Sequence, residues 1–273
     1  MLKLLFWNLD KKEMMPEVES LAGDHQAHIL IFAEDPMTTV SRLVSLNRNQ
    51  PNYFITPTAC KRIKIYTSFG DRFIASRRES PYFTMREISL PKRQPFLLFA
   101  LHWKSLMWRN ISSQTSALIE MARIIREEED RCGHRRTIVV GDFNSEPFSE
   151  GMTLSNGMHA VMCRQVASRE QREISPFGSF PLFYNPSWSL YGDDRSDPPG
   201  TYYRTSAEEN CQFWHIFDQV LIRPALLPYL PKNSINILTT AGGENLLNKS
   251  GFPLASDHLP ILFTFDIPTI TRS

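Results

Sequence analysis

VVGDFNSEP, residues 139–147, carries an acid and an amide directly behind an apolar run. The run 138–140 is typical of a buried strand, and Gly141 ends it. Packing gives such a strand no reason to end in Asp142 and Asn144, although both residue types are also common in turns. Enzymes with α/β folds often place functional side chains at strand ends, so the stretch predicts that Asp142 and Asn144 belong to a site.

Other apolar runs are followed by polar side chains in the same way. Three of them share the pattern: Asn8 after residues 2–7, Glu34 shortly after residues 29–32 and His102 after residues 96–101. Near the C-terminus, Asp257 and His258 come just before the run 261–265. If that last strand is antiparallel to its neighbours, its start lies at the same edge as their ends. The sequence therefore predicts that these polar groups gather at one rim of a sheet.

The residue types in this group indicate a metal site. Its possible oxygen ligands are Glu34, Asp142, Asp257, Asp10 and the amide of Asn8. The group contains no thiolate, and oxygen ligands suit Mg²⁺, with Mn²⁺ as the alternative.

Histidines are the second component of the group. His102 and His258 are suited to phosphate contact or proton transfer. Asp218 lies inside the apolar run 217–222, where an unpaired carboxylate would be costly. A histidine is its natural partner, because the carboxylate fixes the imidazole tautomer and raises its pKa.

Together these stretches resemble the endonuclease/exonuclease/phosphatase superfamily. This is the metal-dependent phosphoesterase fold of deoxyribonuclease I, apurinic/apyrimidinic endonucleases, neutral sphingomyelinases and inositol polyphosphate phosphatases. The matching pieces cover nearly the whole chain: FWNLD at 6–10, IFAED at 31–35, LHWKS at 101–105, VVGDFNSEP at 139–147, FDQVLI at 217–222 and SDHLP at 256–260. The resemblance implies one α/β catalytic domain over residues 1–273, a four-layer sandwich in which two mixed β-sheets pack face to face and are flanked by helices.

The resemblance also implies a set of metal ligands. Glu34 would be the principal ligand, with Asn8 beside it. Asp257 would be a further acid on the metal side, and Asp10 matches an acid of the apurinic-endonuclease branch.

The catalytic roles follow from the same resemblance. Asp142 and Asn144 would position the attacking water and the phosphate. His258, held by Asp218, would act as base or bind the phosphoryl oxygens, and His102 would contact phosphate or assist the leaving group.

Two features depart from the family pattern. Ala33 stands where the family usually has Gln before the metal-binding Glu, so one supporting hydrogen bond is missing or supplied elsewhere. The segment 184–214 matches no characterised branch. It interleaves aromatic residues with arginines: Trp188, Tyr191, Tyr202, Tyr203 and Trp214 with Arg195 and Arg204. That composition suits base stacking and phosphate contact. A loop folded back with its aromatics in the core is the slightly better interpretation for Trp188 and Trp214, and an equally good one for Tyr202 and Tyr203.

Between the runs 96–101 and 137–140 the sequence predicts its clearest helix. One face of it is apolar: Leu118, Met121, Ala122 and Ile125. Ser112 or Ser113 can cap its start, and Gly133 suits the position just past its end.

Bulk composition limits the function classes. The 273 residues carry a net charge of +1, so any contact with nucleic acid must come from local basic clusters. Four such clusters are present: residues 61–64, 77–78, 92–93 and 135–136; surface charge alone explains most of them. The four cysteines lack a CxxC pair, and no secretion signal or bilayer-spanning run is found. We expect a soluble cytoplasmic protein.

The sequence-based hypothesis is a Mg²⁺-dependent phosphodiesterase, preferentially a nuclease acting on nucleic acid. His102, the basic clusters and Trp103, Trp108 and Arg109 motivate that substrate. The alternative is a phosphatase or phospholipase acting on an inositol phosphate, lipid or nucleotide, which the near-neutral charge favours. A catalytically inactive binding protein is a third possibility, although every matched acid, amide and histidine position is filled. A cytoplasmic nuclease would often need a regulatory protein partner.

Overall fold

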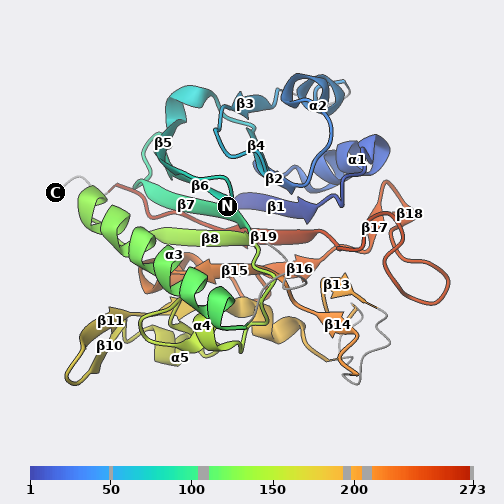
Figure 1. The fold of residues 1–273 in the computed structure, drawn as a ribbon. Coiled ribbons are helices and arrows are strands. Elements are labelled where there is room, and N and C mark those ends of the chain that lie inside the picture. The colour runs from blue at the N-terminus through green and yellow to red at the C-terminus, as the bar shows by residue number, and fades with distance from the viewer. Residues whose placement is uncertain (49–51, 104–110, 193–197, 205–210, 271–273) are drawn as a thin grey trace.

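Two mixed β-sheets pack face to face and helices cover their outer sides, as expected from the sequence (Figure 1). The structure is a computed structural model in which residues 1–48, 52–103, 111–192, 198–204 and 211–270 are described. The organisation as a single domain over the whole chain stays a prediction.

The first sheet has six strands. Their spatial order is β16 (Ile235–Ile237), β19 (Ile261–Phe265), β1 (Leu2–Asn8), β2 (Ile29–Ala33), β4 (Ile63–Thr67) and β3 (Phe54–Thr56). Strands β1 and β2 are parallel, and β19 is antiparallel to β1, which meets the condition stated for the last strand.

The second sheet has seven strands. Their spatial order is β5 (Ile74–Glu79), β6 (Phe83–Ile88), β7 (Phe96–His102), β8 (Thr137–Asp142), β15 (Asp218–Ile222), β12 (Phe183–Tyr184) and β9 (Ala160–Val161). Strands β7 and β8 are parallel, and β15 runs antiparallel to β8. Three two-stranded sheets complete the described β-structure: β10 (Gln171–Ile174) with β11 (Gly178–Pro181), β13 (Tyr202–Tyr203) with β14 (Trp214–His215), and β17 (Thr240–Ala241) with β18 (Glu244–Asn245).

Helices lie on both sides of the sheet pair. The α-helices are α1 (Met15–His25), α2 (Thr39–Leu46), α3 (Ile111–Cys132), α4 (Glu150–Thr153) and α5 (Arg164–Ala167); the 3₁₀ turns are η1 (Asp71–Phe73), η3 (Pro186–Leu190) and η4 (Pro224–Tyr229). In Figure 1, α1 and α2 lie together on one side of the sheets and α3 lies on the opposite side.

The apolar strands are buried on both faces. In β8, Val140 packs in the core between the sheets, while its neighbour Val139 packs beneath α3 with Leu118 and Met121 of the predicted helical face. Successive side chains of a strand point to opposite faces, so a strand covered on both sides must be apolar at every position. This explains why these strands appear in the sequence as continuous apolar runs rather than as alternating ones.

The start of α3 differs from the prediction. The helix begins at Ile111, so Ser112 and Ser113 lie in its first turn and neither is the cap; the residue before Ile111 lies outside the described part of the chain. Its end is as expected, because Gly133 follows Cys132 with φ +67°, a left-handed conformation that glycine adopts readily.

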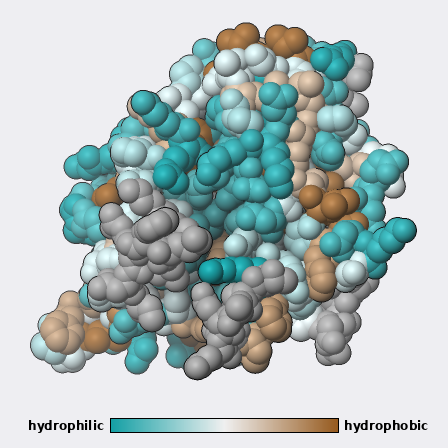
Figure 2. Space-filling view, turned by 45° about the vertical axis from the view of Figure 1, so that its right-hand side comes forward, coloured by the Kyte–Doolittle hydropathy of each residue, from teal (hydrophilic) through white to brown (hydrophobic). Residues whose placement is uncertain are grey.

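The surface is mainly polar on the face shown in Figure 2, and hydrophobic residues form small separate patches there. Two of the more exposed apolar side chains belong to α2, where Val40 and Val44 are 64% and 63% exposed. None of the helices within the described ranges is long and apolar enough to cross a membrane.

A substitution at Gly141 tests the close contact between β7 and β8. It faces Leu101 with φ +149°, and a Cβ at this position would lie 1.9 Å from the Leu101 carbonyl oxygen. Gly141→Ala should therefore lower the free energy of unfolding by about 3 kcal/mol, measured by urea denaturation. Gly70, whose added Cβ would have nothing within 4 Å, supplies the control, and Gly70→Ala should change stability by less than about 0.5 kcal/mol. Equal stability of the two variants would contradict this packing.

Candidate active site

The two sheets are joined by a hydrogen bond between strand ends. Asn8 is the last residue of β1 in the six-stranded sheet, and Asp142 is the last residue of β8 in the seven-stranded sheet. The Asn8 Nδ2 donates to Asp142 Oδ2 at 3.0 Å. Both side chains are buried. The predicted strand ends therefore converge, and they do so from both sheets rather than from the rim of one.

His258 is held in this group by a carboxylate. Its Nδ1 lies 2.8 Å from Asp218 Oδ2, and Asp218 is paired in register with Asp142 across β15 and β8. Ser256 fixes the segment before β19, because its Oγ donates to the Asn8 carbonyl at 2.8 Å and accepts from the His258 N–H at 3.1 Å. The expected histidine partner of Asp218 is thus His258, and both are buried.

Asn144 is held by Asp142 and the end of β7. Its backbone N–H and its Nδ2 donate to Asp142 Oδ1 at 2.8 and 3.0 Å, and Nδ2 also donates to the Trp103 carbonyl at 2.9 Å. Both amide hydrogens are used in these contacts. Its carbonyl Oδ1 accepts none of the hydrogen bonds found among the described residues, so this oxygen is the part of Asn144 left to orient a water.

His102 lies beside the same carboxylate without bonding to it. It is opposite Asp142 in the register of β7 and β8. Its Nε2 is 3.6 Å from Asp142 Oδ2 and 3.6 Å from Glu34 Oε1, both beyond hydrogen-bond distance. Within the described ranges its buried Nδ1 has no partner. His102 therefore lies between the Asp142 network and Glu34.

Glu34 has an uncommon backbone conformation and a carboxylate that accepts no hydrogen bond from the described residues. Its φ is +50°, a left-handed conformation that is uncommon for glutamate. The next residue, Asp35, anchors the turn through a buried bidentate ion pair with Arg42, at 3.1 and 2.9 Å. The nearest cation to Glu34 is Lys11 at 3.6 Å. No donor in the described ranges lies within hydrogen-bond distance of either carboxylate oxygen, although the side chain is only 23% exposed.

Asp10 and Asp257 lie on the more open side of the group. Asp257 Oδ1 is 3.9 Å from His258 Nε2. Asp10 makes an ion pair with Lys12 at 3.0 Å. The Asp10 N–H donates to Asn8 Oδ1 at 3.2 Å, which places Asp10 beside the group. Burial raises the pKa of Asp257 against the opposing charge of His258, and the negative charge of Asp10 adds to the increase. All nine predicted site residues are therefore brought to one region, with Asp10 and Asp257 at its solvent side.

The buried charges give the two histidines opposite states. Burial by itself lowers the pKa of His258, but Asp218 and Asp142 outweigh that effect and raise it to about 10. Burial lowers the pKa of His102 to about 3, with Arg62 and His258 adding to the decrease. Burial also raises the pKa of Asp142, against the opposing charge of His258. At neutral pH His258 is an imidazolium and His102 is neutral.

Two groups of side chains are candidates for holding a divalent cation. Asp142, Asp218 and His258 have their ligand atoms within 4.8 Å of one another. In that group both Asp142 oxygens and Asp218 Oδ2 already take part in hydrogen bonds, and the charged His258 would have to lose a proton; Asp218 Oδ1 is the carboxylate oxygen of the group with no partner among the described residues. Neither Glu34 oxygen accepts a hydrogen bond from the described residues, and the Asn8 amide oxygen, which accepts one from the Asp10 N–H at 3.2 Å, lies at the end of the neighbouring strand. Oxygen donors of this kind fit Mg²⁺ or Mn²⁺ better than the histidine-containing group does.

The aromatic segment after residue 184 contributes to the site in a way that the sequence did not reveal. The Tyr202 ring lies 4.7 Å from the His258 ring and 5.3 Å from that of Phe217. Thr201 Oγ1 accepts from the Asp218 N–H at 3.2 Å. The strand-pair β13–β14 therefore covers the His258–Asp218 pair. No local sequence pattern indicates that contact.

The other described aromatic residues of this segment are mainly packed, which was the preferred interpretation for Trp188 and Trp214 and one of two equal interpretations for Tyr203. Tyr203 stacks on Phe252 at 4.1 Å and lies 5.0 Å from Trp214. Trp188 lies 6.4 Å from Tyr191. Trp108 and Arg109, which motivated a nucleic-acid substrate, and Arg195 of the aromatic segment lie outside the described residues.

A second aromatic group lies beside His102. The sequence did not predict that these residues come together. The Arg62 guanidinium lies 5.3 Å from the Tyr82 ring centroid, and Tyr82 lies 5.0 Å from Trp103. The backbone of Arg62 accepts from the Glu34 N–H at 3.3 Å, which places this cation next to the candidate metal ligand. The basic cluster around residue 62 and Trp103 were its signals in the sequence, and Tyr82 had none.

No protein-family model matches the chain, and no curated protein matches it significantly. Solved structures do match over nearly the whole chain. An endonuclease/exonuclease/phosphatase family protein from Leptotrichia buccalis is 10% identical with a TM-score of 0.58, covering 98% of this chain and 100% of that one. D. rerio TDP2 complexed with a single-strand DNA product is 13% identical with a TM-score of 0.57, covering 97% and 98%.

The endonuclease domain of TRAS1, a telomere-specific non-LTR retrotransposon, is 13% identical with a TM-score of 0.55 and covers 98% of each chain. At this identity the likeness concerns the fold. The two face-to-face sheets, the covering helices and these matches together show that the chain has the four-layer fold of the endonuclease/exonuclease/phosphatase superfamily.

Proposed function

We propose that the protein is a metal-dependent phosphodiesterase that hydrolyses a P–O bond by attack of water. One observation carries the proposal. The Glu34 carboxylate, which accepts no hydrogen bond from the described residues, lies beside a buried hydrogen-bonded network. That network consists of Asp142, Asn144, His258 and Asp218. Cation ligands, proton carriers and a water-orienting amide are the parts that this reaction needs, and here they occur together.

Glu34 and the Asn8 amide oxygen would hold the cation, with Asp10 and Asp257 on the same side. When bound, Mg²⁺ or Mn²⁺ would neutralise negative charge on the phosphoryl and leaving-group oxygens. Glu34 fits this role because its carboxylate is partly buried and uses neither oxygen in a hydrogen bond with the described residues.

The protein side chains would supply the remaining steps. His258 carries a proton at neutral pH, so its Nε2–H can donate to a phosphoryl oxygen, while Asp218 fixes the ring through Nδ1. Asn144 would orient the attacking water through its free Oδ1. Asp142 is a carboxylate with a raised pKa in the same network, which suits it to accept a proton from that water.

His102 would act on the phosphate or on the leaving group from the Glu34 side. It is neutral, and its Nε2 is about equally distant from Glu34 and Asp142. A neutral imidazole can donate a hydrogen bond without adding charge, so this residue would position the phosphate rather than neutralise it.

Nucleic acid is the substrate that the surroundings favour. Arg62 stacked on Tyr82, with Trp103 beside it, lies next to Glu34. On the other side Tyr202 lies against His258. Aromatic rings and an arginine on either side of a phosphate site suit stacking of bases and contact with the backbone. The TDP2 structure with a DNA product and the TRAS1 endonuclease domain have the same fold, which supports this choice.

Several basic side chains of the predicted clusters are paired with acids of the same fold. Arg77 pairs with Glu87 at 2.9 Å, and Arg78 lies 3.3 Å from Glu128, so this cluster is neutralised within the fold. Lys64 is likewise 3.6 Å from Asp35. The near-neutral surface favours the second candidate, a phosphatase or phospholipase acting on an inositol phosphate, lipid or nucleotide.

A substrate panel tests the proposal. Plasmid DNA, single-stranded DNA, RNA, a phosphoinositide and sphingomyelin are incubated with the protein and Mg²⁺, and hydrolysis is followed by product analysis. Cleavage of a nucleic acid is expected, and His258→Ala should lower the rate by about 10²–10⁴-fold because the phosphoryl donor is lost. Hydrolysis of the lipid or inositol substrates alone would identify the second candidate, and a Glu34→Ala protein that cleaves at the wild-type rate would refute the proposal.

The cation position is tested by Mn²⁺ titration calorimetry. Glu34→Gln should weaken Mn²⁺ binding by at least about tenfold, because it removes the principal carboxylate. Asp218→Asn, a matched amide substitution in the other group, should leave Mn²⁺ affinity within about twofold of the wild type. The opposite pattern would assign the cation to Asp142, Asp218 and His258.

The state of His258 is tested by NMR titration of histidine side chains in buffer containing a chelator. Asp218 raises the pKa of His258, so the wild-type imidazole stays protonated through neutral pH. In Asp218→Asn this charge is gone, and the pKa should fall. Identical titration of His258 in both proteins would show that the carboxylate does not hold the proton.

A further inference from the structure

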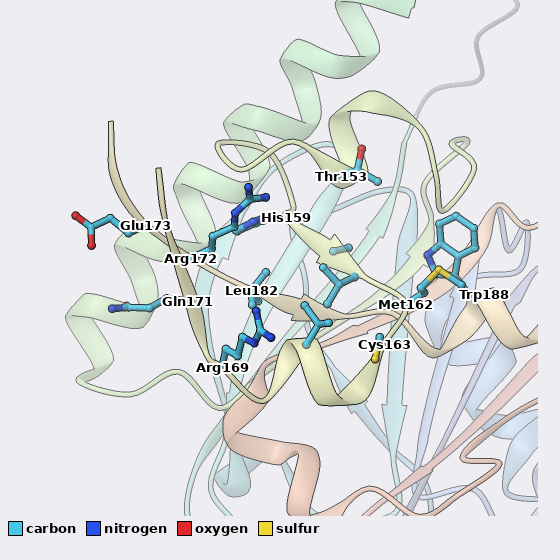
Figure 3. Close-up of a pocket in the computed structure, with 13 residues that line it drawn as sticks. Thr153, His159, Met162, Cys163, Arg169, Gln171, Arg172, Glu173, Leu182 and Trp188 are labelled. Atoms are coloured by element: carbon cyan, nitrogen blue, oxygen red, sulfur yellow. The ribbon is translucent and has the colours of Figure 1, made fainter. Parts of the chain in front are cut away.

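A cavity separate from the candidate active site lies at the free edge of the seven-stranded sheet. Its volume is about 570 Å³, within the range of sites that take small organic molecules. It lies beside the edge strand β9, between α5, the β10–β11 strand pair and η3 (Figure 3). None of the proposed metal or catalytic residues lines it, so an inference about it does not rest on the proposed function.

The interior of the cavity is apolar. Leu182 and Ala160 are buried in its wall. Val166 and Met162 line it and remain 36% and 61% exposed, and the Trp188 ring closes one side. Apolar side chains left partly exposed around one cavity favour a ligand with an apolar body.

Two buried nitrogens in the wall lack the hydrogen bonds that such atoms normally make. His159 is 4% exposed, and within the described ranges its Nδ1 has no partner. The Trp188 indole Nε1–H is also buried without an acceptor among those residues. Buried polar atoms are nearly always satisfied, so these two indicate a ligand with a polar group or water carried with it.

Two arginine side chains lie at the rim of the same cavity. Figure 3 shows Arg172 directed toward His159, and Arg169 near Leu182. Neither guanidinium makes an ion pair with a carboxylate in the described part of the chain. Glu173 is the acid of the lining, and Figure 3 shows its carboxylate directed away from the cavity.

We propose that this cavity binds a small amphipathic anion. The apolar body would lie against Leu182, Val166 and Trp188, and the anionic group would lie between Arg169 and Arg172. The two guanidinium groups at the rim can bind a carboxylate, sulfonate or phosphate. The apolar interior of the cavity can hold the aromatic or aliphatic body to which that group is joined. A neutral body of the same shape would keep the apolar contacts and lose the ionic ones.

The experiment uses two fluorescent probes that differ in charge. 1-Anilinonaphthalene-8-sulfonate has an aromatic body with an anionic group, and N-phenyl-1-naphthylamine has the same body without it. Both are titrated into the wild type, into Arg169→Gln/Arg172→Gln and into Val166→Trp. A control, Lys232→Gln/Lys249→Gln, removes two exposed positive charges elsewhere on the surface.

The arginine variant should weaken sulfonate binding by about tenfold or more and leave the neutral probe within about twofold, because only the charge-assisted contacts are lost. Val166→Trp should weaken binding of both probes by filling the cavity. The lysine control should match the wild type. All substituted positions are at least partly exposed, and circular dichroism verifies folding.

Three results would overturn the proposal. Equal loss of sulfonate binding in the arginine and lysine variants would reduce the effect to net charge. Unchanged binding of both probes in Val166→Trp would place the probes elsewhere on the protein. Sulfonate affinity in the wild type no higher than that of the neutral probe would show that the arginines do not select an anion.

Discussion

The site depends on the hydrogen bond between Asn8 and Asp142, which joins the ends of β1 and β8 from the two sheets. Asp142 is buried, and its oxygens are also satisfied by Asn144. A buried carboxylate that lost these donors would cost about 1–3 kcal/mol for each unsatisfied group, so the network fixes how the sheets meet at this edge. The proposed chemistry follows from that alignment, because Glu34 and His258 flank strands of the six-stranded sheet while His102 and Asp218 belong to strands of the seven-stranded sheet.

The charged groups of the site fall into two sets, the Asp142–Asp218–His258 group and Glu34. Asp142 and Asp218 surround His258 and keep it protonated, so its positive charge offsets part of their negative charge within the fold. Glu34 stands outside this arrangement, on a turn fixed by the Asp35–Arg42 pair. Glu34 is held in place, and the cation beside it is the exposed Lys11 at 3.6 Å, an interaction that water screens strongly; this contrast distinguishes the Glu34 side from the histidine side.

The strand ends could be predicted from the sequence because burial on both faces leaves continuous apolar runs, and a polar residue directly after such a run is a local signal. The position of Ser112 and Ser113 inside α3 was missed because Ile111, before them, is already helical. The contacts of Tyr202 with His258 and of Arg62 with Tyr82 join residues far apart in the chain, and no periodicity encodes them. The pairing of Arg78 with Glu128 likewise becomes visible only in the fold.

The most direct measurement is anomalous X-ray diffraction from crystals of the protein grown with Mn²⁺. The central claim is that strand ends from both sheets leave one free carboxylate to bind a divalent cation beside the buried acid–histidine network. The account predicts an anomalous peak adjacent to the Glu34 carboxylate. A peak between Asp142, Asp218 and His258 instead, or full Mn²⁺ occupancy only at other surfaces, would contradict it.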